Sequence, residues 1–161
     1  MSAEASDILV AEEYRGDAAL LMPLLLMGDE SEAMIGRYLP GGRIFAGRTG
    51  AGGYVAVCVV TEEADGWVEI KNLAVLPQWR RRGFGRAMLS YAEAFYPERN
   101  FRLGTGETPS TLCFYRSCGY RYSHRVEGFF TDNYPHAIVE EGVTLRDMLY
   151  LTKEKQSGGG E

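Results

Sequence analysis

The sequence has few of the residues that build metal centres or disulfide frameworks. Its 161 residues include three cysteines and two histidines. Cys58, Cys113 and Cys118 form no CxxC pair, and an odd cysteine count argues against a disulfide framework. With so few histidines and no zinc-ligand spacing, we expect no metal site. This cysteine usage fits a reducing compartment best, so we expect a cytoplasmic protein.

Membrane and export signals are also lacking. The apolar run AALLMPLLLMG at 18–28 is too short to span a bilayer and contains Pro23. The start of the chain, MSAEASDILVAEEY, has neither the basic segment nor the apolar segment of a signal peptide. We therefore expect no signal peptide and no membrane partner.

Positive charge is in deficit, since 17 lysines and arginines face 22 aspartates and glutamates. Nucleic-acid-binding surfaces are usually basic, so we expect no nucleic-acid partner. A hydrophobic content of 45% excludes an acidic disordered chain. The length suits one domain around one core, which we place at residues 1–152. The remaining segment KEKQSGGGE, at 153–161, is expected to be a disordered tail.

Helix signals recur along the chain. Asp17 is expected to cap a helix over 18–27 that Pro23 kinks or divides, and Ser31 to open a second short helix that ends before Pro40. A third helix follows residue 83, because apolar side chains recur there at helical spacing. A fourth is expected to begin at 109–110, to run through residue 115 and to end at a glycine cap.

Between these helices, apolar, β-branched and aromatic runs predict strands. They lie at 8–14, 43–49, 53–62, 66–77, 101–106, 120–130 and 143–152. The second and third are separated by GAGG and read as a hairpin. Strands and helices are mixed, with a strand-helix-strand-helix centre, which predicts an α/β sandwich with a mixed sheet.

The most informative segment is VLPQWRRRGFGRAML, at 75–89. A strand, a glycine turn and a helix expose backbone N–H groups that favour an anion at the helix N-terminus. Glycines let a phosphate approach the main chain, and arginines add forked donors. The Rossmann pattern is broken because Met88 replaces its third glycine, and the Walker pattern lacks Gly-Lys-Ser/Thr. A solvent-exposed turn remains the alternative.

The segment RRRGFG at 80–85 resembles the R/Q-x-x-G-x-G/A signature of GCN5-related N-acetyltransferases, the GNAT superfamily. Upstream, EIKNLAVLP resembles the strand that precedes this signature, and downstream FYRSCGY resembles the LYxxxGF helix end. The three elements stand in the family's order over roughly residues 43–130. The resemblance is closest to small bacterial members. It implies the GNAT fold, a central mixed sheet splayed into a V with helices on both faces.

The resemblance also implies acetyl-CoA as the co-substrate and identifies the residues that bind it. The main chain at Leu73, Ala74 and Val75 is expected to pair with the pantetheine arm. Thr108 or Glu107 stands where many relatives place an asparagine that touches this arm. The pyrophosphate is expected on the turn that carries the signature, at Arg80, Arg81, Arg82, Gly83, Phe84, Gly85 and Arg86.

For the chemistry, Tyr115 occupies the position of the family's general acid, which protonates the departing thiolate. Glu69 is the candidate base, acting alone or through water. Strand alternation puts Lys71 on the same face as Glu69, so a structural salt bridge is the alternative reading of this glutamate. Glu107 and His136 are the fallback candidates.

The resemblance implies an acyltransferase that moves acetyl from acetyl-CoA to a primary amine of a small molecule or peptide, by direct attack in a ternary complex. A non-catalytic acyl-CoA sensor and a transferase for longer acyl groups are the alternatives. Dimers are common in the family, and the oligomeric state of this chain stays open. Several residues could line the acceptor pocket or pack in the interior, namely Tyr14, Met27, Met34, Phe129, Phe130, Tyr134 and His136.

Overall fold

The computed structural model describes residues 8–50 and 53–155 of the chain. They fall into two compact units. The first comprises the chain up to Glu62 and the segment Ile70–Pro97, and the second comprises Glu63–Glu69 and the chain from Glu98 onward. The predicted α/β class is confirmed, with mostly antiparallel strands and flanking helices. The single domain and the V-shaped opening of the sheet stay predictions.

Four neighbouring strands form the sheet of the first unit. They are β1 (Val10–Tyr14), β2 (Gly42–Arg48), β3 (Tyr54–Glu62) and β4 (Val68–Val75), and β4 contributes to this unit from Ile70 on. The β1–β2 and β2–β3 pairs are antiparallel, which confirms the predicted hairpin. Residues 51–52 of its GAGG turn lie outside the described residues.

Local capping sets the helices that precede β2. Asp17 accepts a hydrogen bond from the Ala19 N–H at 2.9 Å and opens a 3-10 turn, η1 (Ala18–Leu21). Pro23 then stands in the first turn of α2 (Met22–Gly28), so it divides the predicted segment in two. The Ser31 hydroxyl accepts from the Met34 N–H at 3.1 Å. It caps α3 (Glu32–Tyr38), which passes into the 3-10 turn η2 (Leu39–Gly41).

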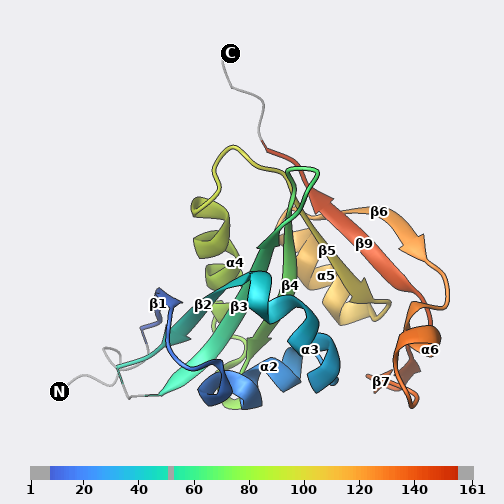
Figure 1. The fold of residues 1–161 in the computed structure, drawn as a ribbon, viewed down its shortest axis with the longest axis horizontal. Coiled ribbons are helices and arrows are strands. Elements are labelled where there is room, and N and C mark those ends of the chain that lie inside the picture. The colour runs from blue at the N-terminus through green and yellow to red at the C-terminus, as the bar shows by residue number, and fades with distance from the viewer. Residues whose placement is uncertain (1–7, 51–52, 156–161) are drawn as a thin grey trace. The chain divides into compact units, whose positions relative to one another are not determined.

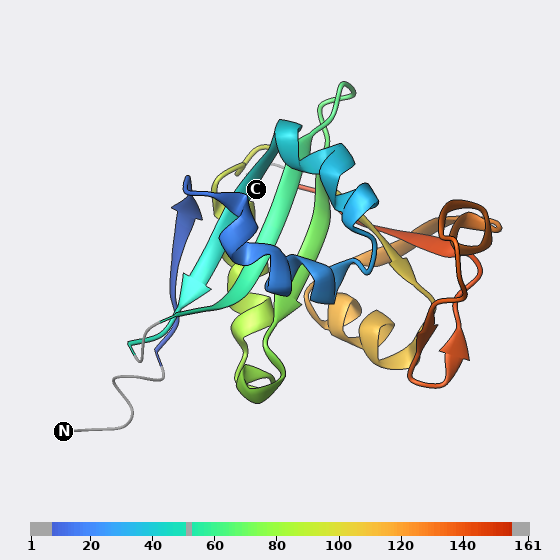
Figure 2. The ribbon, with the colours of Figure 1, turned by 60° about the horizontal axis from the view of Figure 1, so that its bottom comes forward.

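Both faces of this sheet are buried, and different helices cover them (Figures 1 and 2). On one face, α2 and α3 pack on the strands through a cluster made of Leu21, Leu24, Leu25, Ile35, Ala46, Val57, Val59 and Ala74. On the other face lies α4 (Phe84–Ala94). There Phe45 of β2 contacts the rings of Tyr91 and Phe95, at centroid distances of 5.5 and 4.8 Å. The predicted apolar stripe of this helix is confirmed.

The second unit is built on three antiparallel strands in the order β5 (Phe101–Gly106), β9 (Met148–Lys153) and β6 (Arg121–Val126). The helix α5 (Pro109–Ser117) follows β5, as predicted from Pro109. Gly119, with φ of +98°, lies just after this helix, in agreement with the predicted glycine cap. Lys153 still belongs to β9, and residues 156–161 of the predicted tail lie outside the described residues.

Two strand predictions in this unit are wrong at their ends. The strand predicted at 120–130 ends at Val126, because Gly128, at φ of +69°, turns the chain into a short helix, α6 (Phe129–Asn133). The strand predicted at 143–152 begins only at Met148.

The residues before β9 form a hairpin of β7 (Val139–Glu140) and β8 (Val143–Thr144). Its two-residue turn, Glu141 and Gly142, has positive φ at both positions, 53° and 76°. Such a turn matches the twist of paired strands. A Glu-Gly pair is a weak sequence signal for it, which is why the hairpin was not predicted.

Candidate functional site

The glycine-arginine segment forms a tight turn between β4 and α4. It begins with a 3-10 turn, η3 (Pro77–Trp79). Two residues then have left-handed backbone, Arg81 at φ of +64° and Gly83 at φ of +81°. Gly83 is the residue before the first turn of α4, where backbone N–H groups have no partner within the helix. Apart from its chain neighbours, no heavy atom of the described residues lies within 4 Å of the position that a Cβ on Gly83 would occupy. The turn therefore has the open, donor-rich shape that the sequence predicted.

The arginines of this turn differ in what they contact. The Arg80 Nε donates to the Val75 carbonyl at 2.9 Å and ties the turn to the end of β4. The guanidinium of Arg82 lies 4.7 Å from the centroid of the Trp79 ring. That ring stacks on Phe84 at 5.9 Å, with 16° between the planes. Arg80, Arg81, Arg82 and Arg86 are all exposed, so positive charge borders the N-terminus of α4.

The strand β4 leads into this turn. Ala74 is buried in the core cluster, whereas Leu73 and Val75 are half-buried on the opposite face of the strand. Next to them, Asn72 is buried and its amide donates to the Leu25 carbonyl at 2.9 Å and to the Tyr38 hydroxyl at 3.0 Å. Burial raises the pKa of Tyr38. Through these two hydrogen bonds, Asn72 connects α2 and α3 to β4, the strand of the predicted pantetheine contacts.

Glu69, the candidate base, lies in the second unit and is 6% exposed. Its carboxylate accepts from the Arg102 Nε at 3.0 Å. Arg102 also pairs with Asp65 at 2.7 Å and with Glu63 at 3.8 Å. Sequence reasoning considered Lys71 as the cation beside Glu69 and missed Arg102, which is 33 residues away in the chain. Glu69 therefore forms a salt bridge in the structure, as the alternative interpretation expected, and its partner is Arg102.

Tyr150 of β9 also reaches Glu69. Burial chiefly, and then the charge of Glu69, raise the pKa of Tyr150, which hydrogen-bonds to this carboxylate. Tyr150 pairs in register with Gly104, where a Cβ would lie 3.2 Å from the Tyr150 ring. The His124 ring stacks on Tyr150 at 4.9 Å. Glu69 is thus held in a fixed orientation by a cation and a phenol.

We expect Arg102→Gln to destabilise the fold by about 2–3 kcal/mol, because removing one partner of a largely buried ion pair leaves the other charge uncompensated. Chemical denaturation of the purified chain at pH 7 measures this loss. Arg121→Gln, an exposed arginine of β6, is the matched control and should stay within about 0.5 kcal/mol of the wild type.

The pH dependence of stability gives a second readout of the same variant. The hydrogen bond from Arg102 lowers the pKa of Asp65 below its usual 3.8. A carboxylate with a lowered folded pKa stabilises the fold above its unfolded pKa, and this stabilisation disappears as the pH falls through the folded value. Arg102→Gln should therefore lose less stability than the wild type between about pH 4 and pH 2. Equal acid losses would contradict the pairing.

The remaining predicted site residues of the second unit lie on α5 or at its start. Thr108 precedes the helix and is 1% exposed, and its buried hydroxyl has no hydrogen-bond partner among the described residues. Tyr115 is half-buried, and its ring contacts Phe114 at 5.1 Å and Tyr120 at 6.1 Å. Glu107 is exposed and pairs with Arg125 at 3.3 Å.

The aromatic segment after β6 packs on itself. Phe130 is 8% exposed and forms a small cluster with Ile138 and Leu145, against which Phe129 and Tyr134 also pack. These contacts give the rings a structural role, and an acceptor-binding role stays a prediction. His136 is exposed. In the first unit, Tyr14 packs against the α2 and α3 cluster.

Metal and cysteine chemistry find little support. Within residues 8–50 and 53–155, no group of three or more His, Cys, Asp or Glu side chains is arranged to hold a metal ion. Burial raises the pKa of the Cys58 thiol to about 12, so it is a poor nucleophile. None of the helices in the described part of the chain is long and apolar enough to cross a membrane.

Comparisons with known proteins agree with the arrangement of these elements. Residues 40–122 match the family model of the acetyltransferase (GNAT) domain. An uncharacterized N-acetyltransferase from Bacillus subtilis, YvbK, is 30% identical over an alignment of 140 residues, and the match covers 81% of this chain and 86% of the relative.

Two solved structures are similar over nearly their whole length. A GNAT family acetyltransferase from Elizabethkingia anophelis, solved with acetyl-CoA bound, has a TM-score of 0.83 and 28% identity, covering 91% of this chain and 97% of that one. An IAA acetyltransferase from Bacillus cereus has a TM-score of 0.85 and 30% identity, covering 91% of this chain and 99% of that one.

Proposed function

Because the chain belongs to the GNAT family of acetyltransferases, we propose that it moves an acetyl group from acetyl-CoA to a primary amine of a small molecule or peptide. The turn at 80–86 is the observation that carries this proposal. It combines a left-handed glycine, open space beside that glycine and exposed arginines at a helix N-terminus. The acetyl-CoA bound to the relative from Elizabethkingia anophelis supports the same co-substrate here.

The residues of the first unit fit acetyl-CoA as a ligand. The backbone donors of 81–86 are the groups that would hold the pyrophosphate, and Arg81, Arg82 and Arg86 would add positive charge. The contact between Arg80 and the Val75 carbonyl gives Arg80 a second task, which is to fix the turn relative to β4. Main-chain groups of Leu73–Val75 would pair with the pantetheine arm.

We assign the two proton transfers to Tyr115 and Glu69. A lysine-like amine has a pKa of about 10.4 and must lose a proton before it attacks the thioester carbonyl. Glu69 accepts this proton through water, because Arg102 and Tyr150 already contact its carboxylate. Tyr115 donates a proton to the departing thiolate. This transfer is only slightly unfavourable, because a phenol has a pKa of about 10 and a thiol one of about 8.5.

Direct attack by the amine is favoured over a covalent cysteine intermediate. Such an intermediate needs an activated thiol. The thiol of Cys58 is fully buried with a raised pKa, and Cys118 is buried as well. The exposed thiol of Cys113 has no histidine beside it in the sequence.

The test combines coenzyme binding with turnover. Acetyl-CoA at about 100 times its Kd should stabilise the purified chain by about 2.7 kcal/mol in a melting experiment. Release of free thiol over a panel of primary amines then measures transfer. Binding with turnover supports the proposal, and binding without turnover on any amine would indicate a sensor. A comparison of acetyl-CoA with longer acyl-CoA esters identifies the preferred acyl group. The absence of stabilisation by any of them would contradict the proposed function.

A further inference from the structure

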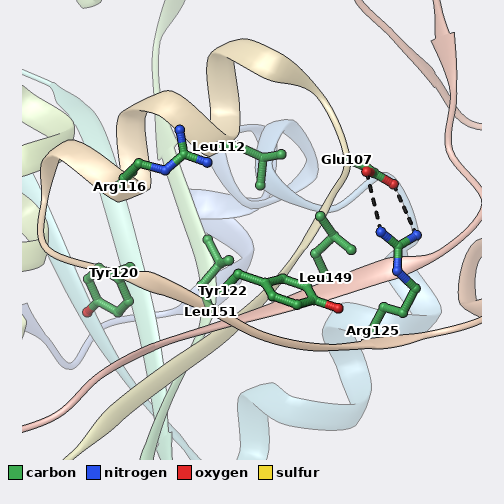
Figure 3. A pocket seen from close by; sticks show the side chains of 8 residues that line it. All are labelled: Glu107, Leu112, Arg116, Tyr120, Tyr122, Arg125, Leu149 and Leu151. Carbon is green, nitrogen blue, oxygen red and sulfur yellow. Dashed lines mark hydrogen bonds and ion pairs between the residues drawn. The ribbon is translucent and has the colours of Figure 1, made fainter.

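The second unit contains a pocket that is lined by none of the residues to which the proposed function assigns a role, although Glu107, a fallback candidate for the base, is among its lining residues. Its volume is about 340 Å³. Figure 3 shows side chains from α5, β6 and β9 converging on it. The lining residues are Glu107, Leu112, Arg116, Tyr120, Tyr122, Arg125, Leu149 and Leu151. This volume is at the lower end of the range for small-molecule pockets, which is about 300–1,000 Å³.

The floor of this pocket consists of apolar side chains from β9 and α5. Leu149 and Leu151 alternate along β9 and therefore share one face of the strand. In the register of the sheet, Leu151 pairs with Tyr122. Leu112 stands one turn before Arg116, on the same side of α5 (Figure 3). Tyr122 is 58% exposed, so its ring borders the pocket without being covered by the protein.

The two arginines of the pocket differ in their partners. Arg125 pairs with Asp147 at 2.8 Å and with Glu107 at 3.3 Å, so its charge is compensated. In the part of the chain that the structure describes, no acidic side chain pairs with Arg116, which is exposed. Arg116 is thus the charged side chain of the pocket that can pair with a ligand. It lies one helical turn from Leu112, which belongs to the apolar floor.

We propose that this pocket binds a small amphipathic carboxylic acid, with an apolar body of about seven to nine carbons on Leu112, Leu149 and Leu151 and its carboxylate on Arg116. The pairing is a charge-assisted hydrogen bond, which is stronger than a neutral one. A protonated amine would be repelled by Arg116, so the pocket does not suit the cationic acceptor of the proposed reaction. The inference goes beyond the proposed function, because it concerns a second ligand of a different class.

The test is a titration of the isotope-labelled full chain with octanoate, followed by NMR amide and methyl shifts in the absence of coenzyme. Octanoate has about ten non-hydrogen atoms, and ligands of this size bind in roughly the millimolar range. We expect saturable shifts at Leu112, Arg116, Leu149 and Leu151. Octanamide, which has the same shape and no charge, should bind about tenfold more weakly.

Two variants separate the pocket from general surface binding. Arg116→Gln should raise the octanoate Kd about tenfold, and Arg121→Gln, which changes an exposed arginine outside the pocket, should leave it unchanged. Equal affinity for octanamide, an unaffected Kd in Arg116→Gln, or shifts that map elsewhere would each overturn the proposal. Shifts at the same residues that follow protein concentration without octanoate would assign the pocket to a second copy of the chain, and would overturn it too.

Discussion

Tyr115→Phe is expected to lower kcat for thiol release by about 10²- to 10³-fold, the range for loss of a positioned general acid. The variant keeps the ring that contacts Phe114 and Tyr120, so the packing of α5 is preserved and only the hydroxyl is lost. Because the role proposed for the hydroxyl concerns only the departing thiolate, the Kd for acetyl-CoA should change by less than about twofold. Steady-state thiol release and calorimetric titration measure the two quantities.

The matched control for this variant is Tyr91→Phe. Tyr91 is a half-buried tyrosine of α4 whose ring packs on Phe45, and it has no place in the proposed mechanism. Its loss of a hydroxyl should leave kcat within about twofold of the wild type. If Tyr115→Phe keeps full turnover, the thiolate is protonated by another group or by water, and Tyr115 is a packing residue.

Gly83→Asp is expected to weaken acetyl-CoA binding by about 100-fold. A carboxylate about 6 Å from a phosphate charge is repelled by roughly 3 kcal/mol at an effective dielectric constant of 20. Steric overlap with the protein contributes little, because no heavy atom of the described residues other than those of its chain neighbours lies within 4 Å of a Cβ at this position. In melting experiments, a coenzyme concentration that stabilises the wild type by about 2.7 kcal/mol should stabilise the variant by about 0.4 kcal/mol.

Gly83→Asn isolates the charge in this experiment. Asparagine and aspartate both tolerate the left-handed backbone that Gly83 has at φ of +81°, so the two variants carry similar strain. The asparagine variant should weaken acetyl-CoA binding by less than about fivefold. Equal losses in the two variants would mean that the backbone at this turn matters and that no anion approaches it.

Features that depend on short stretches of chain were predictable from the sequence. The caps at Asp17 and Ser31 form with N–H groups two or three residues away. The division at Pro23 follows from the missing N–H of proline. The turn at Gly83 was recognisable because only a strand, a glycine pair and a helix are needed to build it. The family resemblance rested on this turn and its neighbours, and residues 40–122 match the GNAT domain model.

Features that depend on strand register were not predictable in the same way. The pairing of Glu69 with Arg102 joins residues 33 apart and required the second unit to be folded. The contact of Tyr150 with Glu69 depends on the pairing of Tyr150 with Gly104, where a side chain would crowd the ring. Local periodicity carries no information on such partners, so the electrostatic surroundings of the candidate base were assigned incompletely.

The sequence by itself determined the α/β class, the helix caps and the glycine turn before α4, because each follows from the backbone preferences of adjacent residues. Only the tertiary structure decided which charges meet, and among the residues that it describes it left Arg116 without an acidic partner beside an apolar floor. The physical reason is that ion pairs and pockets form between side chains that the sheet register brings together from distant segments, whereas caps and turns form within a few residues.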